Sequence, residues 1–212
     1  SRQQGLLEVR KELVQRGLGN ANLRLAPKDL TGIFATTASG ILKGQLSKGE
    51  KVFGMRLEKF KGIIGKELQP GRRLGTEFAD YVKTRTGLRG IFHSDELPNY
   101  GITEAEVRMA GTELGCGEKD AFVLVAASEE KAHKALASVF SRAQQCLEGI
   151  PEETRGAVEG GNTEYLRPLP GAARMYPETD LDPIVVTPEM IREAEKGVPL
   201  SAQKREALYM KM

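Results

Sequence analysis

The chain has 212 residues, of which 40% are hydrophobic and 28% charged, and its formal net charge is only +2. This length and composition are typical of one domain with attached flanking structure. No apolar run approaches the roughly 20 residues that cross a bilayer, and the first residues lack the order of a secretory signal peptide. We therefore exclude a membrane partner and expect a cytoplasmic protein.

The first predicted element is a helix over residues 2–16, where apolar residues recur at three- and four-residue spacing. A weaker helix is predicted over 34–46, and residues 51–59 alternate between apolar and polar side chains like a half-buried strand. Residues 60–74 are rich in glycine and predict a loop, which leads into a helix over 76–86.

The centre of the chain predicts a strand, a tight turn and a helix. Residues 88–93 form a short apolar strand, and Pro98-Asn99-Tyr100-Gly101 has the composition of a turn. Thr103 and Glu106 have the spacing of a capping box, so we expect a helix over 103–114.

The second half begins with the most hydrophobic run of the chain, residues 120–127, which predicts a central strand. Ser128 is predicted to cap the long helix that follows and closes near Gly149. Residues 162–180 hold three prolines and predict an edge strand with an extended continuation. Helices are then expected over 188–196 and from 199 onward. Because the elements at both ends look incomplete, we expect the chain to be cut from a longer protein.

Strands near 51–59, 88–93 and 120–127, each followed by a loop or helix, predict an α+β fold. We expect two layers, with a mainly antiparallel sheet and helices on one face. A fourth strand should come from residues 20–35 or 60–67, and the sequence does not decide between them.

Cysteine and histidine give little indication of chemistry. Cys116 and Cys146 lie thirty residues apart without neighbouring metal ligands, so we expect two reduced packing residues, with a disulfide as the alternative. His93 lies between a strand and two acidic residues, where it is either a general base or a hydrogen-bonded turn residue, and we favour the second. His133 is expected on the solvated side of its helix.

Charge is distributed unevenly along the chain. Residues 41–90 contain twelve Lys or Arg against five Asp or Glu, whereas residues 91–160 contain six against thirteen. The two halves either form faces that attract each other, or the basic half lies near a polyanion such as RNA. Arg72 and Arg73, which precede a predicted helix, are suited to clamp a phosphate, although such pairs more often satisfy carboxylates. The RNA-binding candidates are Arg72, Arg73, Lys59, Lys61, Arg85 and Arg89.

Three segments resemble the E subunit of the archaeal glutamyl-tRNA(Gln) amidotransferase. They are LQPGRRLGTEFADY at 68–81, GIFHSDELPNYGIT at 90–103 and NTEYLRPLPGAARMYPETD at 162–180. Residues 28–150 also resemble a module that this protein family shares with the insertion domain of bacterial-type aspartyl-tRNA synthetases. The segment GCGEKDAFVLVAASEEKAHKALASVFSRA at 115–143 carries that part of the resemblance.

The resemblance implies a division of the chain. Residues 1–27 would be the outgoing helix and link of a larger cradle domain, and residues 28–158 the inserted α+β domain. Residues 159–186 would be the returning cradle strand, and residues 187–212 the start of a helical domain. Arg174, Tyr176, Glu178 and Asp180, on the returning segment, are candidates for lining the substrate cavity of the cradle, although a structural strand and turn is the favoured interpretation.

The resemblance also implies a reaction. The parent enzyme would use ATP and Mg²⁺ to activate the glutamate carried by tRNA(Gln), and would amidate the γ-phosphoryl intermediate with ammonia released by a partner amidohydrolase, the D subunit. The ATP-binding part would lie outside this chain, so we expect a positioning module without a cofactor or metal site. The alternatives are the insertion domain of an aspartyl-tRNA synthetase and a structural or ligand-sensing module without RNA contact.

Overall fold

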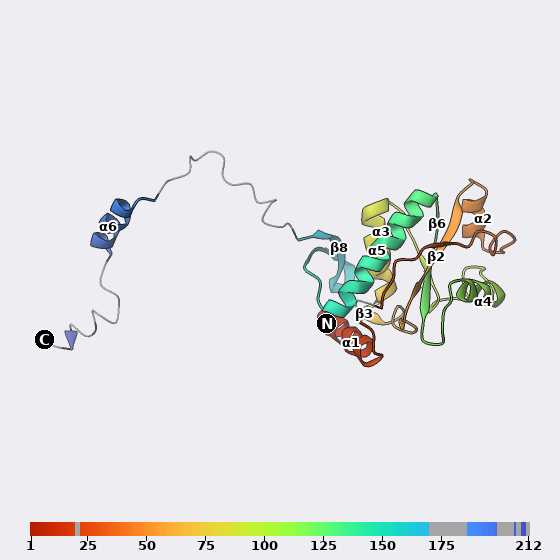
Figure 1. Cartoon of the computed structure of the whole chain (residues 1–212), viewed down its shortest axis with the longest axis horizontal. Helices are drawn as coiled ribbons and strands as arrows, with labels where there is room; N and C mark the ends of the chain where they lie inside the picture. The colour runs from red at the N-terminus through yellow and green to blue at the C-terminus, as the bar shows by residue number, and fades with distance from the viewer. Residues whose placement is uncertain (20–21, 170–185, 199–205, 207–208, 211–212) are drawn as a thin grey trace. The chain divides into compact units, whose positions relative to one another are not determined.

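The computed structural model describes residues 1–19, 22–169, 186–198, 206 and 209–210 (Figure 1). Residues 1–169 form one compact unit and residues 170–212 a second. The helices are α1 (Arg2–Gln15), α2 (Gly40–Leu46), α3 (Leu74–Thr86), α4 (Glu104–Glu113), α5 (Glu129–Glu148) and α6 (Pro188–Gly197), with a 3₁₀ turn η1 (Glu159–Gly161). The strands are β1 (Lys28–Asp29), β2 (Lys51–Leu57), β3 (Glu67–Gln69), β4 (Arg72–Arg73), β5 (Phe92–His93), β6 (Ala121–Ala127), β7 (Glu153–Val158) and β8 (Asn162–Pro168).

The main sheet has four antiparallel strands in the order β1-β2-β6-β5. Its centre is the β2–β6 pair, which runs in register from Lys51 opposite Ala127 to Leu57 opposite Ala121. The α+β class and the antiparallel sheet are therefore confirmed, and the fourth strand comes from the 20–35 region. Strand β5 forms one edge of the sheet.

Helices cover both faces of the sheet, which corrects the expected two-layer arrangement (Figure 1). Met55 and Val123 belong to a core that also contains buried residues of α1, α3 and α5. A second core on the opposite face joins Val52 and Leu124 to buried residues of α2 and α4. The alternation in 51–59 was misleading because Gly54, which looks like a solvent-facing position, is buried against Leu30 and two other leucines.

Several elements differ in extent from their predictions. Helix α2 is shorter than the predicted 34–46 because residues 31–36 form turns instead. The predicted loop 60–74 contains the two-stranded sheet of β3 and β4, and strand β7, which pairs with β8, was not predicted. The strand expected over 88–93 is limited to Phe92–His93.

The helix caps confirm one prediction and refine another. Thr103 Oγ1 accepts a hydrogen bond from the Glu106 N–H at 3.3 Å, and Glu106 Oε2 accepts one from the Thr103 N–H at 2.7 Å, so the capping box of α4 is confirmed. Ser128 occupies the N-cap position of α5, but its side chain makes no capping hydrogen bond. Cys116 and Cys146 are both free, as expected.

Helix α6, in the second unit, confirms the helix predicted over 188–196, and Thr187 Oγ1 caps it by accepting from the Met190 N–H at 3.3 Å. Most of the helix expected from residue 199 onward lies outside the described residues. Within the described part of the chain, no helix combines the length and apolarity needed to span a bilayer.

Candidate functional site

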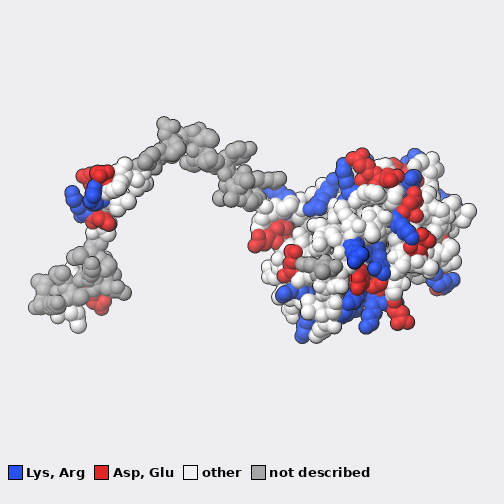
Figure 2. All heavy atoms as spheres, in the orientation of Figure 1, with Lys and Arg blue, Asp and Glu red and all other residues white. Residues whose placement is uncertain are grey.

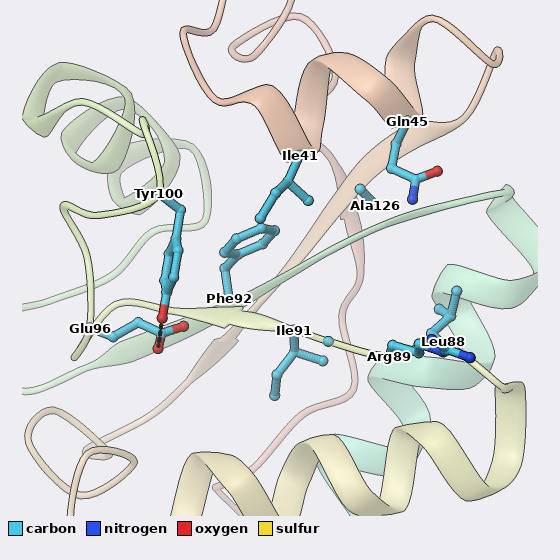
Figure 3. Close-up of a pocket in the computed structure, with 10 residues that line it drawn as sticks. Ile41, Gln45, Leu88, Arg89, Ile91, Phe92, Glu96, Tyr100 and Ala126 are labelled. Carbon is cyan, nitrogen blue, oxygen red and sulfur yellow. Dashed lines mark hydrogen bonds between the residues drawn. The ribbon is translucent and has the colours of Figure 1, made fainter.

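A cavity of about 390 Å³ opens beside β5, at the edge of the main sheet (Figure 3). Its walls come from α2, from the segment that enters β5, and from the turn that leaves it. Most of its surface is apolar, and Phe92 lies near the middle of the lining. The lining residues are Ile41, Gln45, Leu88, Arg89, Gly90, Ile91, Phe92, Glu96, Tyr100 and Ala126.

Polar groups lie at opposite ends of this cavity. Tyr100 Oη donates a hydrogen bond to Glu96 Oε2 at 3.3 Å at one end, and Arg89 lies toward the other (Figure 3). Arg89 is exposed, and it has no ion-pair partner among the residues that the structure describes. The rings of Phe92 and Tyr100 meet edge to face, with centroids 5.7 Å apart. The site therefore combines apolar and aromatic walls with one carboxylate and one guanidinium.

Tyr100 has an unusual backbone conformation. Its φ is +56°, in the left-handed region that non-glycine residues seldom adopt. Gly101, which follows it, also has a positive φ, and a Cβ there would lie 2.9 Å from the Ser39 Cα. The turn thus packs closely against the chain before α2 and presents Tyr100, a residue that is 46% exposed, at the rim of the cavity.

His93 lies next to the site but on the other face of β5. Its side chain is buried against Gly75, and its Nδ1 has no hydrogen-bond partner in the described structure. Its Nε2 lies 3.6 Å from Glu96 Oε2, and its backbone N–H donates to Glu96 Oε1 at 3.4 Å. Burial lowers the pKa of His93, against the opposing effect of the nearby carboxylates. His93 thus helps to hold Glu96 and does not line the cavity.

The six RNA-binding candidates do not converge on one place. Arg72 is half-buried and paired with Asp80, whose pKa is raised by burial in spite of that pairing. Arg73 is exposed at the N-terminus of α3. Arg85 lies in the last turn of α3, about 20 Å away along a 13-residue helix, and Arg89 follows it.

The two lysines occupy the loop after β2. Lys59 Nζ donates to the Gly17 carbonyl at 2.8 Å, whereas Lys61 is exposed. Arg16, which the sequence did not single out, donates to the carbonyl oxygens of Lys59 and Lys61 at 2.7 and 2.8 Å. The remaining candidates, Arg174, Tyr176, Glu178 and Asp180, lie outside the described residues.

The basic and acidic halves of the sequence interleave in space. Figure 2 shows acidic side chains scattered among basic ones on the visible face of the larger unit. Ion pairs join the two halves, including Lys51 with Glu129 at 3.3 Å and Arg56 with Asp120 at 3.7 Å. The interleaving follows from the fold, because β2 of the basic half pairs with β6 of the acidic half. This arrangement supports the interpretation of mutual attraction.

A buried ion network was missed at the sequence level. Glu77 of α3 accepts hydrogen bonds from Arg2 of α1 and from Arg142 Nη2 of α5, the latter at 2.7 Å. Arg155 of β7 lies 3.5 Å from the same carboxylate, and Glu153 pairs with both Arg2 and Arg155. Although burial favours the neutral acid, the guanidinium groups of Arg2 and Arg142 hold the pKa of Glu77 below its ordinary value.

The network has a signal in the sequence. Arg142 lies within the apolar stripe of α5, between Val139 and Cys146, where a charged residue needs a buried partner. The network connects α1, α3, α5 and β7, so it fixes helix α1 and strand β7 to the central helices α3 and α5. Among the described residues, no group of three or more His, Cys, Asp or Glu side chains is placed to hold a metal ion. We assign these residues no step through a magnesium–ATP centre.

Comparison with known proteins shows what this chain is similar to. The GAD domain family matches residues 42–136, from within α2 to within α5. Over 210 residues the chain is 50% identical to the E subunit of the glutamyl-tRNA(Gln) amidotransferase of Pyrococcus horikoshii, and 53% identical to that of Pyrococcus furiosus. Both matches cover 99% of the chain. The chain is a homologue of part of this E subunit.

This relationship covers the whole chain but only part of the relatives. The E subunit of Methanococcus maripaludis is 46% identical over 211 residues, which is 100% of this chain and 33% of that protein. The chain thus spans about a third of the length of the curated relatives it matches. The match with these relatives includes the flanking elements α1, β7 and β8, whereas the GAD match excludes them. The resemblance to the amidotransferase E subunit is therefore confirmed.

Proposed function

We propose that this chain is a positioning module of a tRNA-dependent amidotransferase. In the proposed reaction, the whole enzyme converts misacylated Glu-tRNA(Gln) to Gln-tRNA(Gln) in the cytoplasm, through a γ-phosphoryl-Glu-tRNA intermediate. ATP and Mg²⁺ serve the activation step, and a partner amidohydrolase, the D subunit, releases ammonia from glutamine. The observation that carries the proposal is the identity of about half of all residues to the E subunit, along the entire chain.

The proposed organisation assigns 28–158 to an inserted domain and 1–27 and 159–186 to the cradle domain that holds it, with 187–212 beginning a helical domain. The GAD match at 42–136 falls inside the proposed insertion. The ion network around Glu77 supports a rigid connection, because it joins the outgoing helix α1 to α3 and α5 of the insertion. A module held this firmly is suited to position a bound macromolecule relative to the rest of the enzyme.

Two other interpretations are weaker. An aspartyl-tRNA synthetase insertion would share the central region, but the relationship to the amidotransferase relatives extends through both flanks. A structural module without RNA contact gains support from the pairing of Arg72 with Asp80 and from the interleaved charges. RNA contact remains the favoured proposal, because Arg73, Lys61 and Arg89 are exposed.

The test is tRNA(Gln) binding, followed by fluorescence anisotropy from about 50 to 200 mM salt. We expect affinity that falls as salt rises, with a shallower dependence when Lys61 or Arg73 is replaced by glutamine. Arg108→Gln is the matched control, because Arg108 is an exposed arginine of the acidic half. If the wild-type chain shows no affinity even at low salt, the RNA role is refuted.

A further inference from the structure

We propose that the cavity beside β5 binds a single unpaired nucleotide, with the base against the rings of Tyr100 and Phe92 and a phosphate at Arg89. This inference rests on the proposed function to the extent that the nucleotide belongs to tRNA. The ligand chemistry is that of a nucleobase carrying a phosphate, and a free mononucleotide shares it. The experiment below separates these two sources.

The shape and lining of the cavity support this ligand. Its volume of about 390 Å³ falls within the range of roughly 300–1,000 Å³ of small-molecule sites. Proteins that recognise unpaired bases pack them on aromatic side chains, and Tyr100 is 46% exposed at the rim. The left-handed backbone conformation of Tyr100 costs conformational energy, and contacts of the surrounding turn maintain it. Such strained residues are common in binding sites.

The polar groups match the two ends of a nucleotide. Glu96 presents a carboxylate, which accepts hydrogen bonds from the exocyclic amino group of guanine, adenine or cytosine, a donor that uracil lacks. Arg89, at the other end, is an exposed guanidinium without an ion-pair partner in the described structure, which suits a phosphate. The distribution of charge therefore gives the ligand a direction, with the base toward Glu96 and the phosphate toward Arg89.

The backbone adds further recognition groups. The pairing between β5 and β6 reaches only Phe92, and the backbone of Arg89, Gly90 and Ile91 forms no hydrogen bond with other described residues. Free N–H and C=O groups at the cavity wall are available to a base edge. They are equally available to an extended peptide, which would add a strand to the sheet edge. The charged ends and the exposed tyrosine favour the nucleotide.

The experiment compares matched variants of the chain. Tyr100→Ala removes the ring at the rim, and Tyr209→Ala removes another exposed tyrosine, in the second unit, as its control. Arg89→Gln removes the phosphate partner, with Arg108→Gln as its control. Binding of tRNA(Gln), of GMP, AMP, CMP and UMP, and of a short polyvaline-type peptide is measured for each variant. Circular dichroism of every variant verifies that it folds.

We expect Tyr100→Ala to weaken tRNA(Gln) binding by roughly 5- to 150-fold, the range of one lost base–aromatic contact, and Tyr209→Ala to leave it unchanged. Arg89→Gln should lower the slope of log affinity against log salt by about 0.7, the value for one single-strand phosphate. Binding of GMP, AMP or CMP in preference to UMP, lost in Tyr100→Ala, would assign the site to free nucleotides as well.

The outcomes separate this inference from the proposed function. If wild-type chain binds tRNA(Gln) but Tyr100→Ala and Arg89→Gln bind it equally well, the nucleotide site is overturned while the RNA role stands. If no tRNA binds but mononucleotides do so through Tyr100, the RNA role fails and the cavity is a free-nucleotide site. Binding of the peptide alone overturns the proposal in favour of strand addition.

Discussion

Removing the negative charge at Glu77 should destabilise this protein more than any exposed charge substitution. Glu77→Gln keeps the size of the side chain but leaves the Arg142 guanidinium, which is 0% exposed, without its carboxylate partner. Glu77 Oε2 by itself accepts two hydrogen bonds from Arg142, at 2.7 and 3.3 Å, and one from Arg2, at 3.1 Å. Breaking a buried ion pair by removing one partner costs about 3–5 kcal/mol.

Urea unfolding followed by circular dichroism measures the loss in free energy of unfolding, and thermal unfolding should show a fall in melting temperature of roughly 6–20 °C. Glu104→Gln is the control, because Glu104 forms an exposed pair with Arg108 and its loss should leave the midpoint unchanged. Arg142→Leu combined with Glu77→Gln should cost less than the sum of the two single changes. A Glu77→Gln loss below about 1 kcal/mol would refute the view that the network holds the flanking helix to the insertion.

Three further predictions concern other sites. Burial lowers the pKa of His93, so as pH falls below about 6.5 the unfolded state takes up a proton before the folded state does. The free energy of unfolding should therefore decrease with acidification in that range. Urea unfolding at different pH values measures this decrease, which His93→Gln should flatten. Thr103→Ala should cost about 1 kcal/mol by the same assay, whereas Ser128→Ala, at a cap without a side-chain hydrogen bond, should cost little. Gly54→Ala should cost about 1–3 kcal/mol of stability, because the new Cβ would lie 2.6 Å from Leu30 Cδ1. Equal stability of mutant and wild type would contradict this packing.

Local sequence signals identified most of the helices and the two central strands. The capping box at Thr103 and the apolar stripe of α5 depend on neighbours in the sequence, so they were recognisable without tertiary information. The second helical layer was not recognisable in this way. Whether Gly54 faces water or a core depends on α4 and on Leu30, which lie far away in the sequence.

The candidate site likewise combines features that depend on sequence neighbours with features that depend on residues far apart in the sequence. The turn containing Tyr100 was recognised from its composition, but the cavity forms only when α2 packs beside the segment entering β5. The pairing of Arg72 with Asp80 and the network around Glu77 also join residues whose partnership no short pattern specifies. The sequence did not predict strand β7, because its six residues lack a clear alternation of apolar and polar side chains. The strand is defined by its pairing with β8.

The most direct test of the central proposal is a conversion assay. The chain is mixed with the partner amidohydrolase, ATP, Mg²⁺, glutamine and Glu-tRNA(Gln), and formation of Gln-tRNA(Gln) is followed beside a reaction that contains a full-length E subunit. We predict product only with the full-length protein, because we propose that this chain positions and does not catalyse. ATP-dependent product formed by the chain at a comparable rate would contradict it.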